Sequence, residues 1–287
     1  MRCDLWRNSG AKVHRSANAP SPGAFSPRMS DNANSTSLNK YIANSGICSR
    51  READQIIAEG RVTLNGEVAR PGNRVEPGDV VLLDGKPLRG KRPEPVYLLY
   101  NKPRGIVCTT DRRERHNVID AIDFPERIFP VGRLDKDSQG LLVLTNNGDI
   151  VNKMLRAGNA HEKEYIVTVD KPITRDFLVN MRSGVPILDT VTRRADVQQV
   201  NKKTFRIVLT QGLNRQIRRM CEHLGYEVRH LKRVRVMHLK LGDLRVGEHR
   251  KFTKREYKQL MFHLRHSSGE PFAERTKSPA KKQARRK

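Results

Sequence analysis

The chain has 287 residues, of which 36% are hydrophobic, so it can bury a core and exceeds the usual length of one small domain. Its longest apolar runs fall well short of the roughly 18 to 20 residues that a bilayer-spanning helix needs. Residues 1–10 lack the apolar stretch of a secretory signal. We therefore expect a cytoplasmic protein of two domains, with no membrane partner.

The formal net charge is +25, and most of it belongs to the central part of the chain. Residues 1–36 contribute +3 and residues 266–287 contribute +5, which leaves +17 for the 229 residues between them. Cationic side chains that contact phosphates release counterions from a nucleic acid, so a body this basic indicates a polyanionic partner. We favour a nucleic-acid-binding protein over one with a merely solvated basic surface.

Both ends of the chain are predicted to be tails. Residues 1–36 are rich in Ser, Asn, Pro and Ala without periodicity, which is typical of disorder. Residues 266–287 form a basic tail, which is either an arm that grips RNA or a solvated end. The cysteines are scattered, with no C-x-x-C pair, so reduced structural thiols are expected. They are Cys3, Cys48, Cys108 and Cys221.

Residues 37–84 are predicted to form a compact module of two helices and a small sheet. Ser49 and Glu52 have the spacing of a capping box, which begins the second helix. The dipeptide Asn65-Gly66 is typical of a tight turn between strands. The expected elements are helices near residues 38–46 and 49–60 and strands at residues 61–64 and 80–83.

Arg50 and Arg51 stand in the first turn of the second predicted helix, where positive charge opposes the helix dipole and does not stabilise the helix. This placement favours contact with a phosphate, although the same two residues would also suit a solvated face. Lys40, on the first predicted helix, joins them as a candidate nucleic-acid contact.

A second domain is predicted at residues 96–265, after a linker at residues 85–95 that is rich in proline and basic residues. Strands and helices alternate in this region, which indicates a mixed α+β domain. The expected strands are residues 96–100, 141–144, 165–169 and 205–210, and the expected helices are residues 174–182 and 214–224, the latter capped by Asn214.

Residues 132–142 carry the sharpest candidate site, a polar turn that runs directly into an apolar strand. Catalytic side chains favour loops of this kind, held by a rigid element. Asp135 and Asp137 also fit the start of a calcium-binding loop, but Asn146 stands where that loop requires a bidentate glutamate. An ordinary Asp/Gly turn remains an equal alternative on spacing alone.

Two further segments could carry function. Arg215, Arg218 and Arg219 lie early in the predicted helix 214–224, against the helix dipole, which favours holding a carboxylate or phosphates. Tyr165 follows a charged run and is either a core residue or a platform on which a base stacks. The sequence shows no ligand set of a metal-dependent deaminase and no glycine-rich phosphate loop, so those chemistries have no support.

Together these segments resemble the RNA pseudouridine synthases of the small-subunit/large-subunit ribosomal class. Residues 132–142 are similar to the family's signature, and residues 163–165 and 212–220 resemble its later motifs, in the same order. Residues 37–84 resemble the S4 RNA-binding module of that class. The implied fold is α+β: a helix-helix-sheet module, then a catalytic domain with a mixed, largely antiparallel sheet flanked by helices.

The resemblance extends over about residues 37–262. Residues 135–140 and 156–165 are most similar to the F-type large-subunit branch, which modifies one uridine of 23S ribosomal RNA. Relatives of that branch can also act on a tRNA anticodon. The resemblance implies a monomer without cofactor or metal. The alternatives are a sister synthase that acts on 16S RNA or another 23S site, and a non-catalytic RNA-binding assembly factor.

The implied reaction breaks the N1–C1′ bond of a uridine, turns the uracil and joins C5 to C1′. Asp135 matches the catalytic carboxylate, whether it attacks C1′, attacks the base or removes the C2′ proton. Tyr165 matches the aromatic residue that stacks on the uracil, and Arg218 matches the basic partner of the carboxylate, with Arg215 as a competitor. The residues expected to contact RNA are Arg133, which fills the space of the flipped base, and Arg215, Arg219, Lys40, Arg50 and Arg51.

Overall fold

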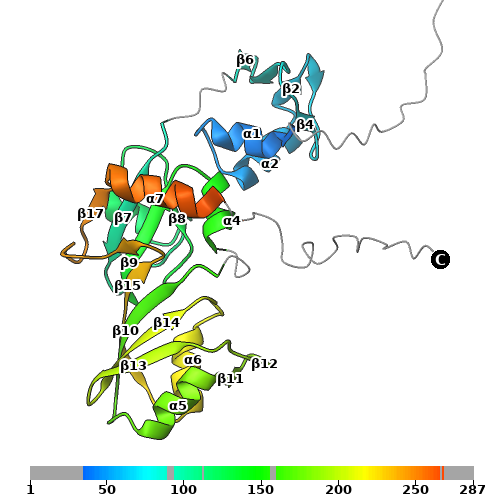
Figure 1. Ribbon diagram of the computed structural model, residues 1–287. Coiled ribbons are helices and arrows are strands. Elements are labelled where there is room, and N and C mark those ends of the chain that lie inside the picture. The colour runs from blue at the N-terminus through cyan, green and yellow to red at the C-terminus, as the bar shows by residue number, and fades with distance from the viewer. Residues whose placement is uncertain (1–34, 89–93, 112, 156–159, 266, 268–287) are drawn as a thin grey trace, which may run out of the picture.

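The computed structural model describes residues 35–88, 94–111, 113–155, 160–265 and 267. Nearly all of the two predicted tails, together with Cys3 and much of the predicted linker, lies outside the described residues. A small module sits beside one end of a larger, elongated domain (Figure 1). Within the described part of the chain, none of the helices has the length and apolar character needed to span a bilayer.

The small module follows the sequence prediction closely. The capping box at Ser49 and Glu52 is formed, and Asn65 and Gly66 both adopt positive φ in the turn. Apolar side chains from the two helices and the sheet enclose one core. The module consists of β1 (Thr36–Ser37), α1 (Leu38–Asn44), α2 (Arg50–Ala58), β2 (Val62–Leu64), β3 (Glu67–Val68), β4 (Arg74–Val75), β5 (Val81–Leu83) and β6 (Lys86–Pro87).

One boundary of the predicted linker is wrong. β6 pairs with β5 and completes a four-stranded sheet of order β3-β2-β5-β6, so the start of the predicted linker 85–95 belongs to the module. The physical reason is the turn before it, where Asp84 and Gly85 adopt positive φ and reverse the chain into another strand.

The larger domain is built on one mixed sheet of nine strands, whose central order is β13-β14-β10-β15-β9-β7-β17. β9 and β15 run parallel, whereas the other strand pairs described in this sheet are antiparallel. The strands are β7 (Tyr97–Lys102), β8 (Phe129–Val131), β9 (Gln139–Thr145), β10 (Lys163–Val169), β13 (Asp196–Asn201), β14 (Thr204–Leu209), β15 (Val228–Val236), β16 (Leu239–Lys240) and β17 (His249–Lys251).

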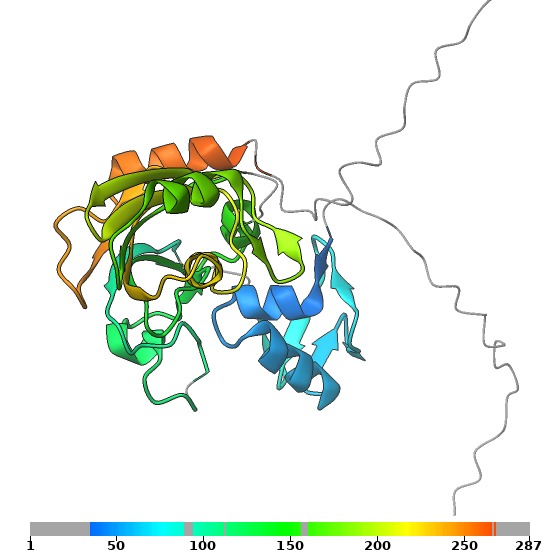
Figure 2. The ribbon, with the colours of Figure 1, turned by 90° about the horizontal axis from the view of Figure 1, so that it is seen from below.

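Helices cover this sheet in two separate groups, one near each end (Figure 1), and Figure 2 looks along the line that joins the two ends. Phe177 of α5 and Met220 of α6 pack with apolar residues of β10, β13 and β14 in one core, whereas Leu260 of α7 packs with β7 and β9 in another. The remaining elements are α3 (Val118–Ile122), α4 (Asp149–Leu155), α5 (Arg175–Ser183), β11 (Pro186–Ile187), β12 (Thr190–Val191), α6 (Gln216–His223) and α7 (Lys254–Arg265).

The two halves of the sheet meet where β9 runs beside β15. Gly140 pairs with Arg233 at this point, and a Cβ atom at Gly140 would overlap the backbone oxygen of Arg233. The φ of Gly140 is +111°, in a region that side chains rarely adopt. Glycine therefore permits the close approach, which places the turn before β9 directly against β15.

The predicted cap of α6 is wrong. The helix begins at Gln216, and the residue in the capping position is Arg215, whose left-handed backbone has φ 49° and ψ 33°. Asn214 instead accepts hydrogen bonds from Arg219, at 3.2 Å to its carbonyl oxygen and 3.3 Å to its side chain. Because Arg215 adopts the left-handed turn, the side chain of Asn214 does not reach the N–H groups of α6.

Candidate active site

A cavity of about 530 Å³ lies between the turn that follows β8, the first residues of β10 and the start of α6. Pockets of this volume suit small molecules and single nucleobases. Among the residues in its wall are Arg133, Asp135, Lys163, Tyr165, Arg215, Arg218 and Arg233. The structure thus brings together five of the residues that the sequence analysis selects, and two that it does not, Lys163 and Arg233.

The turn at residues 132–138 presents Asp135 to this cavity. Gly132 has a φ of +77°, and the N–H of Ser138 donates to the carbonyl of Asp135 at 3.0 Å, which closes the turn. Leu134 and Ser138 are buried on either side, whereas the side chain of Asp135 is 34% exposed. The turn is therefore fixed by its buried residues and leaves one carboxylate facing the cavity.

Lys102, at the end of β7, lies behind this turn. Its fully buried ammonium donates to the carbonyl oxygens of Pro103 at 2.7 Å and Ile106 at 2.8 Å, and lies 3.5 Å from that of Lys136. Burial lowers the pKa of Lys102, partly offset by Cys108, Asp137 and Asp135. Sequence reasoning missed this residue, because a lysine at the end of an apolar strand is typical of an exposed strand end.

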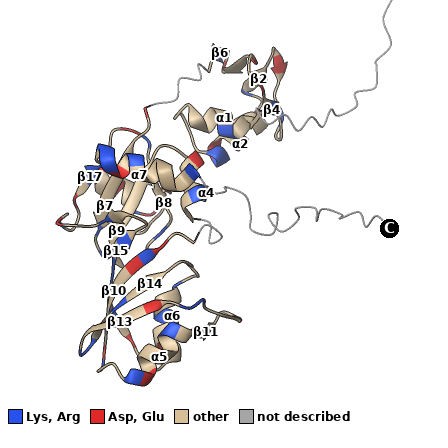
Figure 3. Cartoon of the chain, viewed as in Figure 1, with Lys and Arg blue, Asp and Glu red and all other residues tan. Residues whose placement is uncertain are grey.

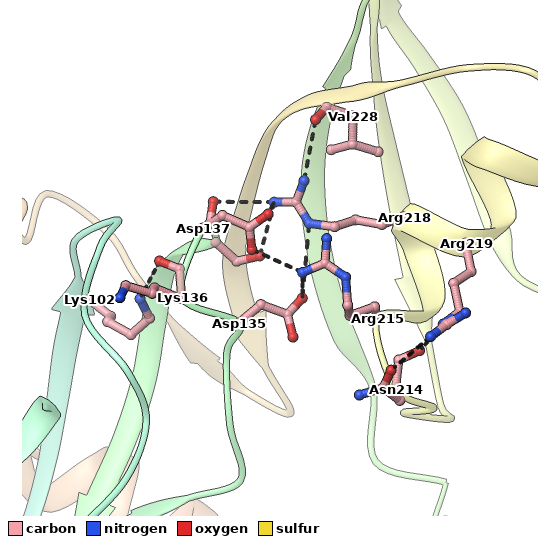
Figure 4. A network of polar contacts seen from close by, with 10 residues as sticks. Lys102, Asp135, Lys136, Asp137, Asn214, Arg215, Arg218, Arg219 and Val228 are labelled. Atoms are coloured by element: carbon pink, nitrogen blue, oxygen red, sulfur yellow. Dashed lines mark hydrogen bonds and ion pairs between the residues drawn. The ribbon is translucent and has the colours of Figure 1, made fainter. Parts of the chain in front are cut away.

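Two arginines of the α6 region face the turn (Figure 4). Nη2 of Arg218 lies 3.2 Å from the carboxylate of Asp137 and donates to Ser138 Oγ at 3.3 Å, while Nη1 donates to the carbonyl of Val228 at 3.3 Å. Nη1 of Arg215 lies 3.3 Å from the carboxylate of Asp137. Burial raises the pKa of Asp137, but Arg218 and Arg215 outweigh it, so this pKa lies below its ordinary value.

Asp135 lies slightly farther from the same two arginines. Its Oδ2 is 3.9 Å from Nη1 of Arg215 and 4.0 Å from Nε of Arg218. That Nε is buried and has no hydrogen-bond partner among the described residues. No hydrogen bond to the carboxylate of Asp135 forms within the described part of the chain, so its oxygens are available to a ligand. The arrangement is a cleft with arginines beside the aspartate, and it differs from an exposed Asp/Gly turn.

Tyr165 is partly a core residue and partly exposed to the cavity, so it combines the two possibilities that the sequence left open. It lies on β10 opposite Ile207 of β14 and Arg233 of β15. Its ring packs partly against the cores of both halves of the domain and also lines the cavity. Arg133, an exposed residue, lies in the cavity wall as well. Both positions are compatible with a base that enters the cavity.

The other selected residues lie away from the cavity. Arg219 is turned toward Asn214 and does not line the cavity wall. Arg50 and Arg51 are exposed on the small module, whereas Nζ of Lys40 lies 2.6 Å from the carboxylate of Asp149 on α4. In this structure Lys40 therefore contributes to the contact between the two domains.

Comparisons with known proteins identify both domains of the chain. The RNA pseudouridylate synthase family model matches residues 96–223, and the S4 domain model matches residues 36–81. The dual-specificity RNA pseudouridine synthase RluF of Escherichia coli (strain K12) is 55% identical over 237 residues, which is 82% of each chain. The ribosomal large subunit pseudouridine synthase B of Bacillus subtilis is 37% identical over 78% of this chain and 94% of its own. A crystal structure of a pseudouridylate synthase superposes with a TM-score of 0.58 at 26% identity, covering 78% of this chain and 99% of that chain.

Proposed function

The chain belongs to the family of RNA pseudouridine synthases that carry an S4 domain, and we propose that it converts one uridine of 23S ribosomal RNA into pseudouridine and also accepts a tRNA. The single observation that carries the assignment of the site is Asp135, which faces a cavity with two guanidinium groups within 4.0 Å. The similarity to a dual-specificity synthase over 82% of both chains supports two RNA substrates.

Asp135 is the proposed catalytic residue. When the N1–C1′ bond of a uridine breaks, C1′ becomes electron-poor, and a carboxylate beside it can attack, stabilise or deprotonate the sugar. A carboxylate without a hydrogen bond from the protein suits each of these roles. Asp137, by contrast, is held by Arg215 and Arg218, and we assign it to positioning those arginines.

The target uridine has to leave its stack to reach the cavity, which costs a few kcal/mol. We assign Arg133, exposed at the cavity, to the space that the flipped base vacates. Tyr165 offers the face of its ring to the uracil, and stacking of a base on an aromatic ring contributes about 1–3 kcal/mol. These roles are those that the family resemblance implies, and the shared cavity supports them.

Arg218 is the proposed basic partner of the catalytic carboxylate. Its free, buried Nε lies 4.0 Å from the carboxylate of Asp135, while its other nitrogens are bonded to the turn and to β15. A small movement of the turn on RNA binding would complete a charge-assisted hydrogen bond. Arg215 has its nearest nitrogen at 3.9 Å from Asp135 but is more exposed, so we assign it to an RNA phosphate.

The small module and the basic surface supply affinity for RNA in this proposal. Lys and Arg residues occur along both domains (Figure 3), and phosphate contacts position an RNA without reading its sequence. The reaction rearranges atoms within one nucleotide, so the proposal includes neither cofactor nor metal and has the monomer as the working form.

The experiment that tests the proposed function maps pseudouridines in the ribosomal RNA and tRNA of cells with the gene, without it, and complemented with Asp135→Ala. We expect one 23S position, and one tRNA position, to lose pseudouridine on deletion. Wild-type protein should restore both, and the variant should restore neither. A 23S RNA profile that does not change on deletion would contradict the proposal, and restoration by Asp135→Ala would contradict the assignment of the site.

A further inference from the structure

Two cations in the wall of the cavity, Lys163 and Arg233, have no anionic partner among the described residues. Arg233 is 4% exposed, and its Nε donates to the carbonyl of Leu141 at 2.7 Å. Nζ of Lys163 lies 3.4 Å from the carbonyl of His161, which is a long and weak contact. No carboxylate of the described residues forms an ion pair with either side chain, although Glu162 and Glu164 stand next to Lys163 in sequence.

The neighbouring glutamates are engaged elsewhere. Glu164 binds Arg206 at 2.8 Å and Arg235 at 2.7 Å, and Glu162 lies 3.0 Å from Arg235. Alternate residues of a strand face opposite sides of the sheet, so these carboxylates lie on the side away from the cavity. Lys163 therefore faces the cavity with other cations near it and with no compensating charge from its own strand.

An ammonium in such a place destabilises the fold, because burial without a counterion costs free energy. Burial, followed by the charge of Arg233, lowers the pKa of Lys163 to about 8. An apolar residue of similar length would serve the packing better. Residues that lower stability in a cavity of this kind are typical of groups that meet a ligand.

The register of β10 places this ammonium beside a base held by Tyr165. Lys163 pairs with Leu209 and Tyr165 with Ile207, without a register shift in between on the β14 side. Two residues along a strand are about 7 Å apart on one face. A uracil in contact with the ring of Tyr165 therefore has an edge within reach of the long side chain of Lys163.

We propose that Lys163 is a further catalytic residue: its ammonium donates a hydrogen bond to a carbonyl oxygen of the uracil and stabilises the negative charge that the base acquires when the N1–C1′ bond breaks. This inference rests on the proposed function. Arg233, which is fixed by its bonds to backbone carbonyls, adds positive potential behind Lys163.

The electron balance explains why a cation is needed there. The electron pair of the N1–C1′ bond stays on the uracil, where N1, O2, O4 and C5 share the charge, while Asp135 faces the electron-poor sugar. C5 then bonds to C1′, the proton on C5 is lost to solvent and N1 gains a proton from solvent. Lys163 keeps all three of its protons throughout, so no oxidant, reductant or co-reactant is required.

The test compares Lys163→Met with Lys163→Arg in the full chain, in single-turnover reactions on an unmodified 23S RNA transcript at saturating enzyme. Loss of one preorganised donor to a developing anion costs roughly 10²-fold or more in rate, so Lys163→Met should fall by about that factor. Lys163→Arg keeps the charge and should stay within about tenfold of wild type. Lys202→Met is the matched control, because Lys202 is exposed in the turn between β13 and β14 and does not line the cavity.

A second RNA identifies the charge that Lys163 stabilises. In a transcript that carries 5-fluorouridine, fluorine withdraws electrons and stabilises the uracil anion, so the deficit of Lys163→Met in N1–C1′ cleavage should shrink by about tenfold or more. An equal deficit on both RNAs would overturn the proposal. So would a loss of affinity with a flatter salt dependence and an unchanged saturated rate, because that result identifies a phosphate contact.

Folding provides a third measurement. Removing a half-buried, uncompensated charge should leave the melting temperature of Lys163→Met equal to or above that of wild type, whereas a structural role predicts a lower one. The outcome is also separable from that of the proposed function. Activity in Asp135→Ala would refute the assignment of Asp135, while full activity in Lys163→Met beside an inactive Asp135→Ala would refute this inference alone.

Discussion

The two aspartates of the turn at residues 132–138 have different surroundings, and this difference predicts different consequences of mutation. Asp135→Asn should abolish pseudouridine formation with little effect on folding or RNA binding, because it removes the one carboxylate of the turn that the protein leaves without a hydrogen bond. Asp137→Asn should lower the saturated rate by only about tenfold, because Arg218 keeps its contacts with Ser138 and Val228. Single-turnover rates and melting curves of both variants provide the test, and equal losses would contradict the division of roles.

Lys163 also predicts a pH dependence. The charged groups in the same cavity wall are Arg133, Asp135, Lys136, Arg215, Arg218 and Arg233. Because the pKa of Lys163 is lowered to about 8, its ammonium is present below that pH and is lost above it. The single-turnover rate constant, measured at enzyme concentrations well below saturation, depends on the protonation state of the free protein. It should therefore fall as the pH rises through about 8.

Lys163→Arg is the control for this pH dependence, since a guanidinium stays charged over the whole range. Dividing the wild-type rate by that of Lys163→Arg removes any titration of the RNA itself. A ratio that stays constant from pH 7 to 9.5 would show that the ammonium of Lys163 does not limit the reaction.

At the scale of single residues, the sequence singles out Asp135 because its turn resembles a family signature, and the structure places that residue in the cavity wall. Within the motif at residues 163–165 the sequence selected Tyr165 and not Lys163. It did not select Lys102 or Arg233, since a basic residue in a strand is ordinarily exposed. Their burial depends on which strands become neighbours. Arg233 is buried because β15 runs beside β9, a pairing between residues more than ninety positions apart that no local pattern contains.

At the scale of elements, amphipathic segments were predictable and basic strands were not. The two helices of the small module, α5, β9, β10 and β14 follow apolar periodicity, and the structure confirms them. β15 was missed, because five of its nine residues are Arg, Lys or His. The wrong cap of α6 has a different cause: a left-handed residue at Arg215 is rare outside glycine and asparagine, and propensity does not indicate it.

The meeting of β9 and β15 predicts that Gly140→Ala is strongly destabilising. The new Cβ would overlap the backbone of Arg233, and the backbone would be strained at a φ of +111°. These two effects together cost about 3 kcal/mol or more and would displace the turn that carries Asp135. Denaturant unfolding and activity assays should show both losses.

Gly148→Ala is the matched control, because its Cβ would make an ordinary contact at 3.8 Å with Phe129 and its backbone is unstrained. We expect its stability to stay within about 1 kcal/mol of wild type. If Gly140→Ala were as stable as this control, β9 and β15 could not lie as close together as the structure has them.

At the scale of the whole molecule, the small module contacts the catalytic domain through a few polar groups. Lys40 lies 2.6 Å from Asp149, and Arg127 donates to the carbonyl of Cys48 at 2.8 Å. Arg127 also lies 4.0 Å from Glu52, at the limit of an ion pair. Exposed ion pairs of this kind contribute at most about 1 kcal/mol each, so these contacts orient the module more than they stabilise either domain. The chain order of the two domains was predictable from motifs, whereas this interface was not.

The module is therefore expected to contribute RNA affinity and to leave the chemical step unchanged. Arg50 and Arg51 are exposed at the start of α2, far in sequence from Asp135, Tyr165 and Lys163. Changing both to Ala should weaken RNA binding and lower the slope of log affinity against log salt by roughly 0.7 to 0.9 for each lost phosphate contact. The saturated single-turnover rate should stay within about twofold of wild type, because phosphate contacts position RNA without taking part in the bond changes.

The matched control is Lys254→Ala with Arg255→Ala, two exposed basic residues that open α7 in the same way that Arg50 and Arg51 open α2. This pair removes equal charge from a helix start on the catalytic domain, so a general loss of positive potential would affect both double variants alike. Affinity measured at several salt concentrations separates the loss of specific phosphate contacts from a general loss of positive potential. Equal slopes for the two variants would show that the module does not contact phosphates. A collapse of the saturated rate in a folded Arg50/Arg51 variant would show instead that the module, held through Lys40 and Arg127, helps to build the active site.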